Sequence, residues 1–334
     1  MKILFIGGTG IISSACTKLA AEQGNHLTLL NRGETSSKRP IPDRAHELNL
    51  DYSDSESVNS ALKGKEFDVV VNWITFTPDQ IERDIEFYRN RVGQFIFISS
   101  ASAYQTPPAS LPVTESTILD NPFWEYSRNK IACEERLVRA YRDEKFPITI
   151  VRPSHTYDHT SFPFSGGYTN VERMRSNKPV IVYGDGTSLW TLTHNKDFAK
   201  AFIGLLGNNH AIGEAFQITS DEWLTWNQIF QLVANAAGVK KPNLVHVPSE
   251  VIASFDPDWG AGLLGDKSHS MIFDNSKIKR VVPGYKAEIP YSKGVREIIA
   301  WHDEDPARQT IDPVFDKMIE KILKNYPQPH LGVQ

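Results

Sequence analysis

Short apolar runs alternate with amphipathic stretches through the first half of the chain. Runs that predict buried strands lie at residues 3–6, 26–30, 67–74, 95–98 and 148–151. Apolar residues at helical spacing between these runs predict helices at 13–23, 80–90 and 125–142. Strands that are apolar on both faces and alternate with helices are typical of a parallel sheet covered on both sides. Right-handed crossovers then give a doubly wound α/β fold.

The pattern becomes less regular after Arg152 and Pro153. Residues 154–194 are richer in Gly, Pro, Ser, Thr and aromatic side chains. Further elements are predicted as helices at 196–206, 225–237 and 293–302, and as a strand at 215–218. We therefore expect a core over residues 1–153, rejoined by about 196–220, and a smaller C-terminal region built from 154–195 and 221–334. The tail from residue 326 to 334 is expected to be mobile.

A glycine-rich turn connects the first predicted strand to the first predicted helix. It reads Gly7, Gly8, Thr9, Gly10, Ile11, Ile12, Ser13. Residues without a Cβ allow a tight turn and a close approach to a pyrophosphate, and the helix N-terminus supplies amide donors. The turn therefore predicts a dinucleotide site whose contacts come from Gly7, Thr9, Gly10, Ile11 and Ile12. Ser13 stands where such turns place a third glycine for close helix packing.

The end of the second predicted strand bears on the choice of dinucleotide. Enzymes that use NAD place an acid there to bind the ribose 2′-hydroxyl, whereas this chain has Asn31 and Arg32. No carboxylate repels a 2′-phosphate at that position, and a guanidinium can bind one bidentately. We therefore predict that NADP is preferred and that NAD is possible. Asp51 and Tyr52, after a short apolar stretch, are candidates for contacts to the adenine.

The spacing Tyr-x-x-x-Lys occurs twice, at Tyr126 with Lys130 and at Tyr141 with Lys145. The first pair opens a long predicted helix and lies on one face of it, whereas the second closes that helix. A tyrosine has a pKa of about 10, and a nearby ammonium lowers it toward a useful range for proton transfer. Ser100 follows the strand that precedes this helix and can hold a substrate oxygen. The predicted catalytic set is Ser100, Tyr126 and Lys130, with Lys130 also binding the nicotinamide ribose.

Together these motifs resemble the extended short-chain dehydrogenases/reductases, the NAD-dependent epimerase/dehydratase family. The resemblance rests on the glycine turn and on segments 51–54, 99–104, 152–157, 184–186 and 194–197, with Tyr126 and Lys130 between them. It implies a Rossmann-type doubly wound parallel sheet with a smaller C-terminal substrate domain. It also implies that Ser100, Tyr126 and Lys130 are the catalytic triad. Pro153 and His155 are expected to border the nicotinamide.

Several positions depart from the family pattern and mark an atypical member. Ala101 and Ser102 follow Ser100 where family dehydratases carry an Asp-Glu pair, so dehydration of a nucleotide sugar is not expected. Trp190 stands where nucleotide-sugar enzymes place an arginine on the diphosphate, and an indole cannot neutralise phosphate. Ser102 and Trp190 become candidate substrate contacts. The features resemble a branch that includes chloroplast stem-loop RNA-binding proteins.

The sequence therefore predicts an NAD(P)-dependent oxidoreductase or epimerase that acts on a hydroxyl or ketone carbon of a sugar or sugar-like substrate. The alternative is a non-catalytic nucleotide-sensing or RNA-binding protein on the same fold. Among 334 residues the formal net charge is -4, which makes nucleic acid an unlikely partner. No signal peptide, membrane span or metal-binding cysteine spacing is expected, which predicts a cytoplasmic protein. Family analogy predicts a homodimer through the helix of Tyr126.

Overall fold

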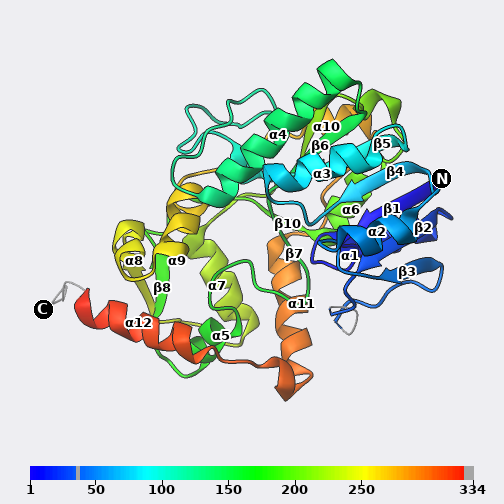
Figure 1. Cartoon of the computed structure of the whole chain (residues 1–334). Coiled ribbons are helices and arrows are strands. Elements are labelled where there is room, and N and C mark those ends of the chain that lie inside the picture. Colours follow the sequence, from blue (N-terminus) through cyan, green and yellow to red (C-terminus); the bar gives the residue numbers. More distant parts are fainter. Residues whose placement is uncertain (35–37, 327–334) are drawn as a thin grey trace, which may run out of the picture.

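The computed structural model describes residues 1–34 and 38–326. Seven parallel strands form the central sheet in the order β11-β6-β5-β4-β1-β2-β3 (Figure 1). The strands are β1 (Lys2–Ile6), β2 (His26–Asn31), β3 (Ala45–Asn49), β4 (Phe67–Asn72), β5 (Val92–Ile98), β6 (Ile148–Pro153) and β11 (Ala215–Ile218). The strand order reverses on either side of β1, which confirms the predicted doubly wound fold.

Helices cover both faces of this sheet and explain the continuous apolar strand runs. One face packs against α1 (Ser13–Glu22) and α6 (Asn195–Ile203). The other packs against α2 (Ser55–Leu62), α3 (Pro78–Tyr88) and α4 (Glu125–Glu144). The side chains of β1 from Ile3 to Ile6 are fully buried, because they alternate between these two apolar layers.

A second lobe has its own apolar core. Its elements are α5 (Tyr168–Arg175), β8 (Val180–Tyr183), α7 (Trp226–Ala236), β13 (Leu244–Val247), α8 (Ser249–Phe255), α9 (Pro257–Gly262), the turn η3 (Leu263–Lys267), α11 (Tyr291–Asp303) and α12 (Pro313–Asn325). The strand pairs β7 (His155–Tyr157) with β10 (Leu192–His194) and β9 (Leu189–Trp190) with β12 (Leu224–Thr225) lie outside the central sheet. Within the described residues, no helix combines the length and apolarity that crossing a bilayer requires.

Some elements were not predicted from the pattern. The edge strand β3 is largely accessible and has no apolar run, because an edge strand is not enclosed by neighbours. Helix α12 packs Ile319 and Ile322 into the second lobe, while most of its other residues remain accessible. The segment 327–334, most of the tail expected to be mobile, lies outside the described residues. The predicted domain boundaries stay a prediction.

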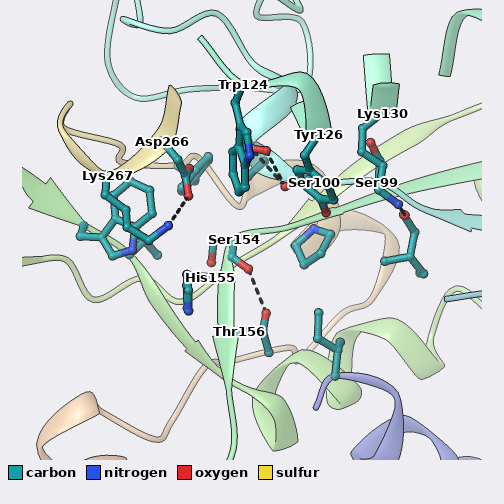
Figure 2. Close-up of a pocket in the computed structure, with 18 of the residues that line it drawn as sticks. Ser99, Ser100, Trp124, Tyr126, Lys130, Ser154, His155, Thr156, Asp266 and Lys267 are labelled. Carbon is teal, nitrogen blue, oxygen red and sulfur yellow. Dashed lines mark hydrogen bonds and ion pairs between the residues drawn. The ribbon is translucent and has the colours of Figure 1, made fainter. Parts of the chain in front are cut away.

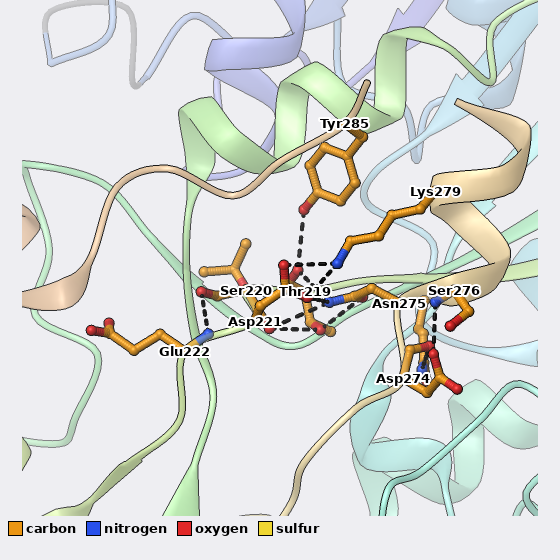
Figure 3. A network of polar contacts seen from close by, with 11 residues as sticks. Thr219, Ser220, Asp221, Glu222, Asp274, Asn275, Ser276, Lys279 and Tyr285 are labelled. Atoms are coloured by element: carbon orange, nitrogen blue, oxygen red, sulfur yellow. Dashed lines mark hydrogen bonds and ion pairs between the residues drawn. The ribbon is translucent and has the colours of Figure 1, made fainter. Parts of the chain in front are cut away.

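A polar network ties the end of β11 to the segment that begins α10 (Ser276–Val281) (Figure 3). The Asn275 amide donates to the Thr219 carbonyl and to the Asp221 carboxylate, both at 3.0 Å. Lys279 donates to the same carboxylate at 2.8 Å, and the Tyr285 hydroxyl donates to the Thr219 carbonyl at 3.1 Å. These contacts hold the chain where it leaves the sheet for the second lobe.

A buried ion pair between α4 and β6 provides a test of the fold. Arg152 and Glu134 are 5% and 2% exposed, and the guanidinium Nε lies 2.9 Å from the Glu134 carboxylate. We expect Glu134→Ala to lower the free energy of unfolding by about 3–5 kcal/mol, because it leaves a buried cation unpaired. Urea denaturation measures the loss. Glu22→Ala, which removes an exposed partner of Lys18, is the control and should cost less than about 0.5 kcal/mol.

Candidate functional site

The predicted catalytic residues line one cavity at the carboxyl ends of the sheet strands. This central cavity, of about 310 Å³, is lined by Ser100 after β5, by Tyr126 and Lys130 of α4, and by Ile12 of the glycine turn. The second lobe closes its far side (Figure 2). The other Tyr-x-x-x-Lys pair does not line the central cavity, and Tyr141 is 39% exposed. Tertiary structure thus separates two motifs that share one spacing.

The ammonium of Lys130 is held at the edge of the sheet. It is 1% exposed and donates to the main-chain carbonyls of Thr75 and Ile98 at 2.7 and 2.8 Å. Burial lowers the pKa of Lys130 to about 7, while the two carbonyl acceptors favour its protonated form. Its Nζ lies 5.8 Å from the centre of the Tyr126 ring. The lysine therefore titrates near neutral pH beside the phenol.

Tyr126 is not acidified in this arrangement, contrary to the sequence expectation. Burial raises the pKa of Tyr126 to about 12, and a hydrogen bond with Ser100 acts in the opposite direction. Lys130 donates to two main-chain carbonyls, and its charge does not offset the effect of burial on the pKa of the phenol. At neutral pH the Tyr126 hydroxyl is protonated and available to donate a proton.

Ser100 belongs to a chain of hydroxyls. Its Oγ lies 2.9 Å from the Ser102 Oγ, and Ser127 of α4 donates to the Ser102 Oγ at 2.8 Å. Ser102 lines the cavity but is only 3% exposed. The hydrogen bond to Ser100 lets Ser102 orient that hydroxyl, and a substrate contact at Ser102 stays a prediction.

A groove beside the glycine turn has the features of a dinucleotide site. This glycine-turn groove, of about 400 Å³, is lined by Gly7 and Gly10, by Arg32 and Asp51 from neighbouring strand ends, and by Phe76, which also lines the central cavity. Gly7 adopts φ +88, and a Cβ there would lie 2.5 Å from the Ile74 side chain. No side chain caps the N-terminus of helix α1, so no capping side chain competes with a bound phosphate for its first main-chain amides. The residues present fit a pyrophosphate at this helix end.

The remaining residues of the turn brace it. The Ser13 Oγ accepts from the Gly10 amide and donates to the Gly7 carbonyl, at 2.8 and 2.7 Å. The serine thus fills the place of the third glycine with two hydrogen bonds. Thr9 lines the groove, whereas the carbonyl of Ile11 accepts from the Asn195 amide of α6 at 2.9 Å.

Asn31 and Arg32 have different roles in the structure. The Asn31 Oδ1 accepts from the Gly8 amide at 2.8 Å, so this predicted cofactor contact braces the turn with its side chain. Arg32 is exposed and pairs with the equally exposed Glu34 at 3.1 Å. A guanidinium and a carboxylate therefore lie side by side at the groove. The prediction of NADP from the sequence considered the guanidinium and did not consider Glu34.

Below the groove lies a buried carboxylate that the sequence analysis missed. Asp84 of α3 is fully buried and accepts hydrogen bonds from Tyr52, Asn72 and Thr75 at 2.6, 2.7 and 2.9 Å. Tyr52 lines the groove, and the Thr75 carbonyl holds Lys130. Asp84 therefore connects the groove to Lys130 by hydrogen bonds. No local motif marks an Asp on the apolar face of a helix for this role.

The end of β6, the segment after it, the start of α4 and the second lobe supply the other walls of the central cavity. Pro153 and His155 line it, and burial together with the Lys267 charge lowers the pKa of His155 to about 3, so that the imidazole is neutral. Trp190 also lines it, 4% exposed and stacked on Trp226 at 5.7 Å. The residues missed at these walls are Trp124, Asp266 and Lys267. Asp266 and Lys267 lie more than a hundred positions from Lys130, with no recognised motif around them.

The chain matches a known protein family over most of its length. Residues 3–219 match the family described as "NAD dependent epimerase/dehydratase family". The chain belongs to this family. Membership makes it an enzyme of the epimerase/dehydratase type and confirms the resemblance of its motifs. It also makes the protein NAD-dependent in the broad sense, and it gives no support to the predicted preference for NADP.

The relatives of this chain have different named functions. It is 27% identical over 257 residues to a chloroplast stem-loop binding protein of 41 kDa from Arabidopsis thaliana, which covers 73% of this chain and 65% of that protein. It is 25% identical over 338 residues to a UDP-glucose 4-epimerase from Lactobacillus helveticus, which covers 92% of this chain and 98% of that protein. The match to the epimerase therefore extends over nearly the whole of both proteins.

A solved structure shares the fold of this family member. UDP-glucuronic acid 4-epimerase from Bacillus cereus, in complex with UDP-glucuronic acid and NAD, superimposes with a TM-score of 0.74 at 19% identity. The match covers 91% of this chain and 99% of that one. At this identity the likeness establishes the fold, and it confirms the Rossmann-type class predicted from the sequence.

The buried Asp84 gives a prediction about pH. Burial raises the pKa of Asp84 to about 6, whereas an unfolded aspartate titrates at about 3.9. Between these values the folded chain holds the extra proton, so the free energy of unfolding falls as pH rises. We expect the wild type to lose about 2–3 kcal/mol from pH 4 to 7 relative to Asp84→Asn. Urea unfolding of both proteins at these pH values measures it, and parallel pH profiles would contradict it.

Proposed function

We propose that this enzyme oxidises or reduces a hydroxyl/ketone carbon of a sugar or sugar-like substrate, or epimerises it through transient oxidation, with Ser100, Tyr126 and Lys130 as its catalytic residues. The observation that carries the proposal is that these three side chains line one cavity, which shares Phe76 with the glycine-turn groove. Proton-transfer groups therefore adjoin the place suited to a dinucleotide.

Each residue has a task that follows from its surroundings. A bound nicotinamide supplies the hydride acceptor or donor. Tyr126 exchanges the proton of the substrate hydroxyl, and as a phenol at neutral pH it is ready to donate to a forming alkoxide. Ser100 holds the substrate oxygen, and Ser102 and Ser127 orient its hydroxyl. Lys130 binds the cofactor ribose, and its cation is the group that favours the tyrosinate when Tyr126 acts as a base.

The proton-transfer role is tested by Tyr126→Phe. We expect this change to lower the rate at which substrate reduces the bound nicotinamide by about 10²–10⁴-fold, because the acid/base group is lost. Stopped-flow absorbance of the reduced nicotinamide provides the measurement. Tyr141→Phe removes the hydroxyl from the second Tyr-x-x-x-Lys pair and is the matched control, with unchanged rate expected. Equal rates in the wild type and Tyr126→Phe would exclude the proposed chemistry.

For the cofactor we propose a preference for NADP. Asn31 brings no charge to the groove, and an exposed Arg32–Glu34 pair is weak, so a 2′-phosphate can compete with Glu34 for the guanidinium. Glu34 is the group that argues for NAD, because a carboxylate there can accept from a ribose hydroxyl.

The cofactor preference predicts a selective effect of Arg32→Ala. Loss of a charge-assisted contact should weaken NADP binding by about 10–100-fold, while NAD binding changes less than about threefold. Calorimetric titration of each dinucleotide provides both constants. The matched variant Glu34→Gln should strengthen NADP binding. Tighter binding of NAD than NADP by the wild type would overturn the preference.

RNA binding is a second candidate function, because the Arabidopsis relative is named as a stem-loop binding protein. The net charge of -4 opposes it. Retention on stem-loop RNA that falls steeply with salt would support it, and salt-independent or absent retention would exclude it. The cytoplasmic location and the homodimer through α4 stay predictions.

A further inference from the structure

An oppositely charged pair enters the central cavity from the second lobe. Asp266 and Lys267 end the π-helical turn η3, and their side chains are 14% and 12% exposed. The Lys267 Nζ lies 3.2 Å from an Asp266 carboxylate oxygen. Figure 2 shows the pair on the side of the cavity away from Lys130, with Tyr126 between them. The pair therefore faces the catalytic residues across the space that a substrate fills.

This pair is incompletely satisfied within the described residues. Lys267 donates to Asp266, and the second carboxylate oxygen of Asp266 has no donor there. Enclosing two charges costs free energy unless further hydrogen bonds satisfy them. The backbone is fixed in place, since the Lys267 carbonyl accepts from the Trp226 indole at 2.9 Å. Such a rigid pair has an acceptor and donors left over for a ligand.

Aromatic rings accompany the pair. The Lys267 Nζ lies 5.7 Å from the Trp124 ring centre and 5.9 Å from that of Trp190, and both rings line the cavity. The indole Nε1 of Trp190 and the hydroxyl of Ser99 are buried with no partner in the described part of the chain. A carboxylate and an ammonium beside indole faces suit a ring that carries neighbouring hydroxyls and apolar C–H groups.

The surroundings do not suit a nucleotide diphosphate. The central cavity, at about 310 Å³, is at the small end of the range of roughly 300–1,000 Å³ for ligand pockets. The neighbouring side cavity, on the other side of the segment 264–270, includes Asp185 and Glu250 and has no lysine or arginine among its described lining residues. Hydrogen bonds from Thr187 lower the pKa of Asp185, which keeps it ionised. A diphosphate placed there would face negative charge.

We infer that Asp266 and Lys267 select a neutral, polyhydroxylated substrate without a nucleotide, such as a free monosaccharide or cyclitol. Asp266 accepts from one hydroxyl, Lys267 donates to the next, and Trp124 packs against the ring. The charges of the pair cancel, so a neutral ligand is matched. The inference deepens the proposed function, because the pair would present a hydroxyl-bearing carbon to Tyr126.

The experiment separates binding from catalysis. Tyr126→Phe protein, loaded with oxidised cofactor, is titrated with D-glucose, D-galactose, D-xylose, myo-inositol, UDP-glucose and dTDP-glucose while tryptophan fluorescence is followed. We expect saturation by at least one of the four free compounds. Adding Asp266→Asn or Lys267→Met should weaken that binding at least tenfold. Glu250→Gln in the side cavity and Lys241→Met at the surface are the matched controls, with less than a twofold change.

Opposite results would overturn the inference. Tighter saturation by a nucleotide sugar than by any free compound, or no saturation by a free compound, contradicts it. Trp124→Leu alters no charge and should show the same loss, which keeps the test valid if a charge variant does not fold. Turnover of UDP-glucose that is indifferent to Asp266 would leave the proposed function standing and remove the inference. Free-sugar binding through the pair with no transfer to bound cofactor in the wild type would remove the proposed function alone.

Discussion

Parallel pairing of the central strands is the constraint on which the site depends. In a parallel sheet every strand ends at the same edge, so chain segments far apart in sequence must emerge together. The register pairs Ile6 of β1 with Asn72 of β4, and Asn72 with Phe97 of β5. The glycine turn, the Thr75 carbonyl and Ser100 therefore meet at one edge. Without this pairing, Ser100, Tyr126 and Lys130 would not line one cavity.

Lys130 of helix α4 binds main-chain carbonyls at that edge. Lys130 is placed against the carbonyls that end β5 and follow β4, and Asp84 of α3 fixes the second of these through Thr75. The same carboxylate accepts from Tyr52 in the floor of the glycine-turn groove. The two halves of the site are thus linked by hydrogen bonds as well as by proximity. Asp84 is a positioning residue, since it reaches the cavity only through its partners.

The second lobe supplies one wall of the central cavity. The proposed catalytic residues line this cavity from the core, whereas Trp190 of β9 and Asp266 and Lys267 of η3 line the opposite wall. Trp190 is packed on Trp226, and the Asp266–Lys267 pair stands beside it. Because these wall residues lie outside the central sheet, a change in them leaves the strands in place.

The sequence by itself determined the elements of the core, the glycine turn and the candidates Ser100, Tyr126 and Lys130, because apolar periodicity and short motifs are local properties. It left unresolved which way side chains point, so it did not show that Asn31 accepts from the Gly8 amide, and it led to the expectation that Tyr126 is acidified although burial raises its pKa. The edge strand β3, Asp84 and the Asp266–Lys267 pair carry no local signal. Only the tertiary structure decided these, because burial, charge pairing and the walls of a cavity arise from residues that the chain brings together across long separations.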